Sequence, residues 1–393
     1  MKPQPLLIAV FLVFCSGALA VGKSASIANT LVVHEWGTFT SVHASDGTLL
    51  TGLEREEHRL PGFVKSHAGF APANKGWDRP VKNVTIKMET PVIYFYADRE
   101  TSVTVDVGFN GGSISQWYPQ RSGGEELAPL PQPLTDIEQW RGMVPVDFAK
   151  TFTGSIQWRA TVLSPDSTEK ITALADWETP QWPRARVEEA NRVRTPDGSV
   201  EGFLFYRGIG NFELPLRISV DAQDRLILVA KPGADIPSVL VYDNRRGVAN
   251  YEWSGLLAGG ETKALAPVRV HTGPLSGELL MEPLMEAGLT EGEAHAMLAT
   301  WKESYFDTPG LRVFWVIPRT FTDAILPIKV TPVPDKMERV LVGRSEVLTP
   351  VFERLLFEGF MADGGKAWVN DRYFSAYRAR VKHLGVVLPA NTP

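Results

Sequence analysis

The chain has 393 residues, of which 44% are hydrophobic and 22% are charged, and its formal net charge is −5. This composition is typical of a globular protein. The mildly acidic charge, without any lysine- or arginine-rich block, argues against nucleic acid or an anionic membrane as the main partner.

The first 20 residues have the pattern of a secretory signal. Lys2 supplies the positive start, residues 6–14 are apolar, and Ala18-Leu19-Ala20 is a small-x-small cleavage site. We therefore expect cleavage after Ala20 and a secreted or periplasmic mature chain. No later apolar run approaches the roughly 20 residues that a transmembrane span needs. The only cysteine, Cys15, leaves with the signal, which excludes disulfides, thiol nucleophiles and thiolate metal sites from the mature chain.

Short β-branched and aromatic runs dominate from about residue 30 to residue 270. They predict strands at 84–87, 92–96, 102–107, 113–118, 156–163, 202–206, 214–220, 226–229, 238–242 and 248–253. Glu89-Thr90-Pro91 lies between the first two strands and is expected to bend the pair or place it at an edge, and Asn110-Gly111-Gly112 predicts a tight turn between the next two. A short charged helix is expected at 184–194. This pattern favours a β-sandwich-like region over residues 21–272.

The last third of the chain has helix signals. Thr290-Glu291-Gly292-Glu293 is a capping box, which predicts a helix to about residue 305. Strands are expected at 311–317 and 339–342, and Thr349-Pro350 predicts the start of a second helix. A last helix is expected at 370–384. We therefore predict an α+β, predominantly β protein, in which a smaller α+β region, 273–393, packs on the β-rich region or belongs to the same domain.

Four of the seven histidines fall in one short stretch, at His34, His43, His58 and His67. In a mature chain without thiols, imidazole and carboxylate are the side chains left to hold a transition metal. These four histidines are therefore candidate metal ligands, and His34 and Glu35 are candidate catalytic residues at the end of a predicted strand. Adjacent strand residues point to opposite faces, so this pair is not expected to bind one ion. The alternative is that the histidines are separate, with His34 buried and hydrogen-bonded.

Two tryptophans, Trp177 and Trp182, flank prolines in a loop-like stretch and are candidate platforms for a glycan. The alternative for each is packing in the core. The sequence has no phosphate-binding loop, no dinucleotide fingerprint and no Gly-x-Ser-x-Gly elbow, so no nucleotide cofactor is expected.

Three segments, His34 to Thr40, Lys87-Met88-Glu89-Thr90-Pro91-Val92 and Val342-Gly343-Arg344, resemble a group of exported bacterial proteins of unknown function. The resemblance implies an exported bacterial protein and no particular activity. Two functions remain open. One is a binding or scaffolding protein of the envelope, with a glycan or a protein as partner. The other is a metal-assisted hydrolase that uses the N-terminal histidines and carboxylates with a divalent metal. The first is favoured, because the histidines match no metal-ligand spacing.

Overall fold

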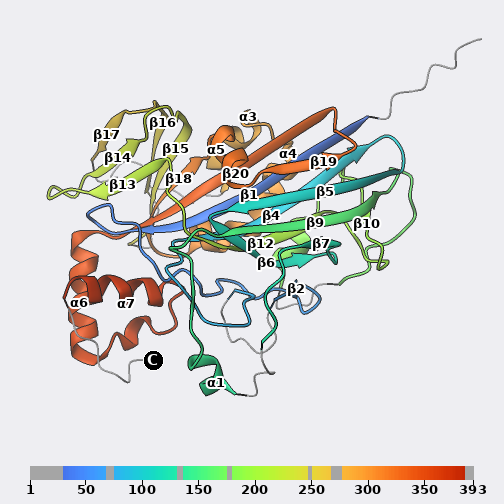
Figure 1. The fold of residues 1–393 in the computed structure, drawn as a ribbon. Coiled ribbons are helices and arrows are strands. Elements are labelled where there is room, and N and C mark those ends of the chain that lie inside the picture. The colour runs from blue at the N-terminus through green and yellow to red at the C-terminus, as the bar shows by residue number, and fades with distance from the viewer. Residues whose placement is uncertain are drawn as a thin grey trace, which may run out of the picture.

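The computed structural model describes residues 30–67, 75–130, 136–174, 179–246, 250–266 and 277–385. The fold is α+β and predominantly β, as the sequence predicts (Figure 1). Within the described residues, its centre is a nine-stranded sheet in the order β16-β15-β18-β20-β1-β4-β12-β6-β2. These strands are β16 (Asn250–Leu257), β15 (Ile236–Asp243), β18 (Leu311–Val316), β20 (Lys336–Val347), β1 (Leu31–His43), β4 (Ile86–Ala97), β12 (Leu204–Gly210), β6 (Gly112–Tyr118) and β2 (Lys65–Ser66).

Two smaller sheets pack against one face of the large sheet. One is β11 (Val200–Glu201), β10 (Val193–Arg194), β9 (Thr153–Val162), β5 (Thr101–Asn110) and β19 (Ile328–Thr331), with β7 (Gly123–Gly124) paired to β9. The other is β13 (Leu216–Val220), β14 (Leu226–Ala230) and β17 (Thr262–Leu265). A short pair, β3 (Val81–Lys82) and β8 (Val146–Asp147), lies apart. Side chains of the large and small sheets share one buried cluster, which gives the sandwich its core.

Helices cover part of the opposite face of the large sheet. They are α2 (Gln181–Arg184), η1 (Gly277–Leu280), α3 (Met281–Glu286), α4 (Glu291–Lys302), η2 (Glu303–Asp307), α6 (Pro350–Asp363), η3 (Lys366–Trp368) and α7 (Phe374–His383). Two helices lie elsewhere: α5 (Arg319–Ile325) packs against the sandwich core through Phe321 and Ile325, and α1 (Ile137–Arg141) has no buried residue. A second buried cluster lies between the sheet and α2, α3, α4 and η2, and a third lies beneath α6 and α7. Figure 1 shows α6 and α7 side by side below the end of β20. None of the helices in the described ranges is long and apolar enough to cross a membrane.

The helix signals of the last third are confirmed. The capping box is present, with Thr290 accepting from the backbone of Glu293 and the Glu293 carboxylate accepting from the backbone of Thr290. Thr349 caps α6 by accepting from the backbone of Phe352. Strands β18 and β20 are inner strands of the large sheet, and β20 pairs in parallel with β1. The last third of the chain therefore supplies inner strands of the large sheet.

The two strands expected on either side of Glu89-Thr90-Pro91 are one strand, β4, which carries a local irregularity where a bend was expected. Thr90 takes a positive φ of 44° and forms an irregularity in the pairing with β1. Gly37 lies opposite, and a Cβ there would be 3.0 Å from the Cα of Pro91, so the close approach needs a glycine. The irregularity shifts the alternation, so Ile86 and Met88 before it and Ile93 and Phe95 after it all face the sandwich core.

Two further expectations are corrected. The turn at Asn110-Gly111-Gly112 exists, but β5 and β6 do not pair; the turn carries the chain from the six-stranded sheet to the large one. Between 184 and 194 the chain makes turns, and the only helix nearby is the single turn α2. Both outcomes depend on contacts with distant strands, which override local preference.

Candidate functional site

The four candidate histidines lie in four separate places. His34 Nδ1 is 2.9 Å from the Glu293 carboxylate, His43 Nε2 is 3.2 Å from the Ser41 hydroxyl, His58 Nε2 is 3.9 Å from Glu57, and His67 Nε2 donates to the Ile114 carbonyl over 3.2 Å. No group of three histidine, aspartate or glutamate side chains in the described residues is placed to hold a metal. The predicted histidine site is therefore not assembled. The reason is geometric, because His34 and His43 are nine residues apart on one strand, about 30 Å.

His34 and Glu35 face opposite sides of β1, as expected. The Glu293 carboxylate that binds His34 also accepts from the Tyr96 hydroxyl over 2.8 Å and caps α4, so His34 fastens that helix to the sheet. Glu35 is fully buried in the sandwich core, where it accepts from the Tyr206 hydroxyl over 2.5 Å and from Arg339 Nε over 2.6 Å. The side chains of His34 and Glu35 therefore each link β1 to other elements of the fold. This agrees with the alternative interpretation of His34 as a buried, hydrogen-bonded residue.

Trp182 is only 5% exposed, so it offers no open face to a sugar. It packs among aromatic rings of the second core, including those of Phe63 and Phe205, and its indole N–H donates to Glu201 over 3.0 Å. The expectation of an exposed platform is therefore wrong for Trp182. The other candidate, Trp177, lies outside the described residues.

A set of buried charged side chains lies elsewhere in the fold, and we call this set the charged centre. It comprises Lys75, Lys87, Arg207, Arg312, Arg344 and Arg372 with Glu56, Glu57, Glu89 and Glu346. Its strand residues lie on β4, β12, β18 and β20, on the face away from the sandwich core. The centre fills the space between the second and third hydrophobic clusters.

The register of three strands explains how the centre is built. Thr40 of β1 lies directly opposite Lys87 of β4 on one side and Arg344 of β20 on the other. Directly opposed residues point to the same face, so these three form one row across the sheet. Glu89 lies opposite Thr38 in the row before, and Glu346 lies opposite both Val42 and Arg312 in the row after.

Residues 54–57 form a loop that covers the row. The side chains of Arg55, Glu56 and Glu57 each contact a different part of the structure. Glu57 accepts from Arg344 Nη2 over 2.9 Å and is also paired with Arg372. Glu56 pairs with Arg207, and Arg55 donates to the backbone carbonyls of residues 369 and 371 over 3.1 and 3.2 Å. The loop is therefore fixed to strands and helices that are far away in the sequence.

Electrostatic interactions inside the centre are weakly screened, because its side chains are buried. Burial lowers the pKa of Lys87 to about 8, although the nearby carboxylates of Glu57 and Glu89 partly oppose the shift. The pKa of Glu57 lies well below its usual value, because Arg344 and Arg372 outweigh the desolvation of this carboxylate. Burial raises the pKa of the Tyr373 phenol, which stays protonated.

A groove of about 670 Å³ opens beside the centre, and we call it the α6–α7 groove. Its inner wall includes Glu346 and Arg372 of the centre, together with Tyr373. Apolar and aromatic side chains line the outer part: Val351, Phe352 and Leu355 of α6, Trp368 of η3 and Tyr377 of α7. Arg245 and Arg246 also line the groove, together with the acids Asp224 and Asp371. Apolar walls with a few convergent polar groups are typical of ligand sites.

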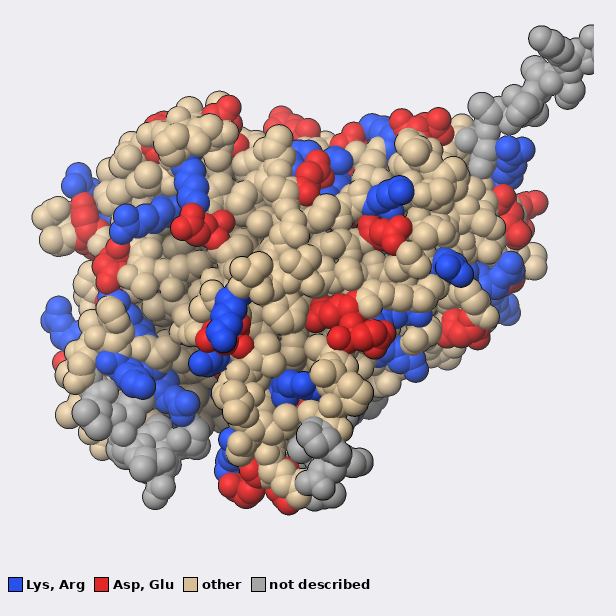
Figure 2. All heavy atoms as spheres, viewed as in Figure 1, with Lys and Arg blue, Asp and Glu red and all other residues tan. Residues whose placement is uncertain are grey.

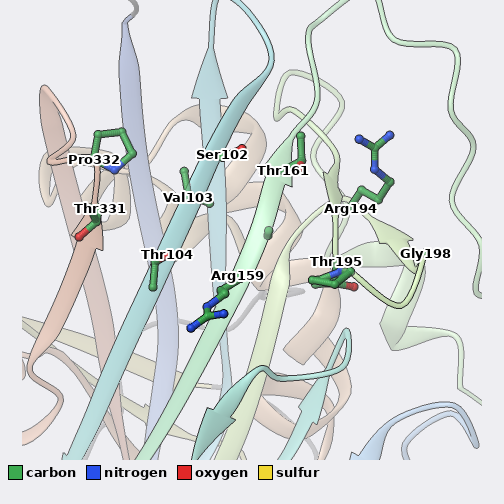
Figure 3. Close-up of a pocket in the computed structure, with 12 residues that line it drawn as sticks. Ser102, Val103, Thr104, Arg159, Thr161, Arg194, Thr195, Gly198, Thr331 and Pro332 are labelled. Carbon is green, nitrogen blue, oxygen red and sulfur yellow. The ribbon is translucent and has the colours of Figure 1, made fainter.

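A second hollow, of about 630 Å³, lies over the outer face of the six-stranded sheet. Its cationic side chains do not converge, since Figure 3 shows Arg159 and Arg194 pointing away from each other. Arg194 is moreover paired with Glu169. On the face shown in Figure 2, lysine and arginine are interspersed with aspartate and glutamate, without one large patch of either sign. We therefore take the α6–α7 groove and the charged centre as the candidate site.

Reasoning from the sequence missed these residues because their partners lie far apart in the chain. A local signal does exist. Lys87 stands between Ile86 and Met88 in a strand with apolar neighbours. Lysine is rarely buried unless other groups compensate its charge, so a lysine at such a position indicates a special environment.

Comparisons with known proteins add little to this geometry. No protein-family model and no curated protein matches the sequence. Among solved structures, the Fcho1 Mu homology domain of Danio rerio with bound Eps15 peptide is 8% identical over 81% of this chain and 97% of that chain, with a TM-score of 0.30. The yeast delta-COP-I mu-homology domain complexed with a Dsl1 WxWxV peptide is 9% identical over 81% and 98%, with a TM-score of 0.29. Overlaps this loose assign neither a family nor a ligand.

Proposed function

We propose that the protein is an exported binding protein whose α6–α7 groove takes a small ligand that joins an apolar body to a carboxylate. The proposal rests on one observation, which is that the groove has an apolar part and a charged part. Its outer part is apolar and open, with Val351 60% and Leu355 51% exposed, and its inner wall belongs to the charged centre. Covering two exposed apolar side chains favours binding by roughly 25 cal/mol per Å² of buried surface.

Charge favours an acidic group at the inner end of the groove. The charged centre holds six cationic side chains against four carboxylates that pair with them. Burial raises the pKa of two further carboxyls at its edge, Glu54 and Asp371. Three arginines line the groove among the acids Asp224, Glu346 and Asp371: Arg372 on the inner wall, and Arg245 and Arg246. The proposal takes Arg372 as the partner of the ligand's carboxylate. The volume of about 670 Å³ lies within the range for small-molecule sites.

Export is the second part of the proposal, and it is supported by the signal-like residues 1–20 and by the resemblance to exported bacterial proteins. The three segments that carry this resemblance lie on the neighbouring strands β1, β4 and β20. When the full-length chain is expressed in a bacterium, we expect the protein in the periplasm or medium to begin at Val21. N-terminal sequencing checks this, and an intact Met1 on a cytoplasmic protein contradicts it.

The groove is tested by titration calorimetry with octanoate, acetate and octanol. Octanoate combines the two features, and we expect it to bind at least about 10-fold more tightly than either acetate or octanol. Leu355→Ser is expected to weaken octanoate about 10-fold without affecting acetate. Met361→Ser is the matched control, because Met361 is 61% exposed on the same helix but outside the groove. Equal binding of octanoate by both variants contradicts the proposal.

A further inference from the structure

Lys75 and Glu89 form a buried ion pair whose geometry is not that of a hydrogen bond. The Lys75 ammonium lies 2.6 Å from Oε1 of Glu89, and the two side chains are 0% and 1% exposed. Neither the ammonium nor either oxygen of Glu89 makes a hydrogen bond of good geometry within the described residues. Such a pair is costly, because hydrogen bonds do not offset the desolvation of its two charges. A change that removes both charges from this buried place therefore stabilises the fold.

The backbone fixes both ends of the contact. Lys75 takes a positive φ of 43°, and its carbonyl accepts from the Ser115 hydroxyl over 2.6 Å. Glu89 lies on β4 directly before Thr90, whose φ of 44° is also positive. Residues other than glycine rarely adopt this conformation unless the surrounding structure imposes it, and such positions gather at functional sites. The structure around the pair therefore holds the amine against the carboxyl group.

The contact brings the lysine nitrogen within reach of the carboxyl carbon. A C–O bond of this kind is about 1.2 Å long, so Nζ of Lys75 lies no more than about 3.8 Å from Cδ of Glu89. Groups held about 3–3.5 Å apart in a fixed orientation react far faster than the same groups free in solution. Nη1 of Arg207 lies 3.5 Å from the other carboxyl oxygen, Oε2. Its positive charge stabilises negative charge that develops on that oxygen.

We infer that Lys75 and Glu89 are joined by an isopeptide bond that the folded chain forms by itself. Nζ passes a proton to Oε1 across their contact and attacks Cδ. The Nζ–Cδ bond forms and the Cδ–Oε1 bond breaks, and Oε1 leaves as water with two of the three ammonium protons. Oε2 becomes the amide oxygen beside Arg207, and the nitrogen keeps one proton. Atoms and charge balance without any cofactor or oxidant.

The surroundings favour the proton transfer that starts the reaction. The charges of Lys75 and Arg207 lower the pKa of Glu89, so the pair begins as two ions. Burial lowers the pKa of Lys75, and the charge of Arg207 lowers it further, so the ammonium loses its proton more readily than in water. The resulting neutral amine is the nucleophile. Neither Lys75 nor Glu89 lines the α6–α7 groove, so the inference is independent of the ligand proposed there.

Intact-mass spectrometry of the folded wild-type protein, incubated at neutral pH, tests the bond. We expect a mass about 18 Da below the value calculated from the sequence of the same chain, because one water is lost. Trypsin is also expected not to cut after Lys75, since its amine is blocked. The peptide of residues 66–82 then stays joined to the peptide of residues 88–99, and fragmentation places the bond.

Lys75→Met removes the amine and is expected to have the full mass calculated from its sequence. Lys87→Met is the matched control, because Lys87 is equally buried but lies outside the pair, and it is expected to keep the deficit of about 18 Da. Where Lys75→Met does not fold, the joined peptide of the wild type decides alone. Two results overturn the inference. One is a wild-type protein with its full mass or with separate 66–75 and 88–99 peptides, and the other is a deficit that Lys75→Met retains.

Discussion

Replacing Arg344 by methionine is expected to lower the free energy of unfolding by about 3–5 kcal/mol, the usual cost of breaking a buried ion pair from one side. Arg344 is 0% exposed, and its guanidinium donates to Glu57, Glu346 and the Tyr373 hydroxyl. Without it, two buried carboxylates lose a cation, and the covering loop loses its main attachment to β20. Urea unfolding at pH 7 measures the effect.

The matched control for Arg344 is Arg141→Met. Arg141 pairs with Glu138 over 2.8 Å, but their side chains are 64% and 75% exposed. A surface pair of this kind is worth less than about 1 kcal/mol. Losses of similar size in the two variants would show that the charged centre adds no more to stability than a surface pair, and would contradict the account.

The second large effect is a rise in the stability of the wild-type protein with pH, caused by Lys87. Its pKa is about 8 in the folded state, against 10.5 for an ordinary lysine. Between these two values the unfolded chain still holds a proton that the folded chain has released, so the unfolded state binds more protons and stability rises with pH. The cost of burying the charge, present below pH 8, amounts to about 3 kcal/mol.

Lys87→Met removes this dependence. At pH 7 the variant is expected to be more stable than the wild type by about 3 kcal/mol, and the difference should vanish toward pH 10.5. Urea unfolding in a chloride buffer from pH 7 to pH 10 gives the difference curve. Lys82→Met, with its exposed lysine, is expected to give a flat difference. If the Lys87→Met curve is also flat, Lys87 is not a strained buried cation.

Elements with local signals could be predicted from the sequence, and elements decided by distant contacts could not. The capping box at Thr290 and the Thr349-Pro350 start were found because each signal is complete within four residues. The continuity of β4 through Pro91 was missed, because it depends on Gly37 on another strand. A tight turn was expected between β5 and β6 and is present, but each of these strands finds its partners in a different sheet, which the local turn signal could not show.

The candidate site shows the same limit more strongly. Its central row joins positions 40, 87 and 344, and its cover comes from residues 54–57. The histidine cluster attracted attention because its members are close in sequence, yet β1 carries His34 and His43 far apart. The pairing of β1 with β20 spans about three hundred residues and decides the whole arrangement. Motif spacings describe residues that are close in the sequence, so they cannot predict a contact between residues this far apart.

The central claim is that the α6–α7 groove binds an apolar acid, and the most direct test is a crystal structure with 8-bromooctanoate. Anomalous scattering locates the bromine without ambiguity. The account predicts a bromine peak within about 4.5 Å of Leu355 or Val351 and the carboxylate at the inner wall beside Arg372 and Tyr373. A bromine peak elsewhere on the molecule, or none in crystals soaked well above the measured Kd, would contradict it.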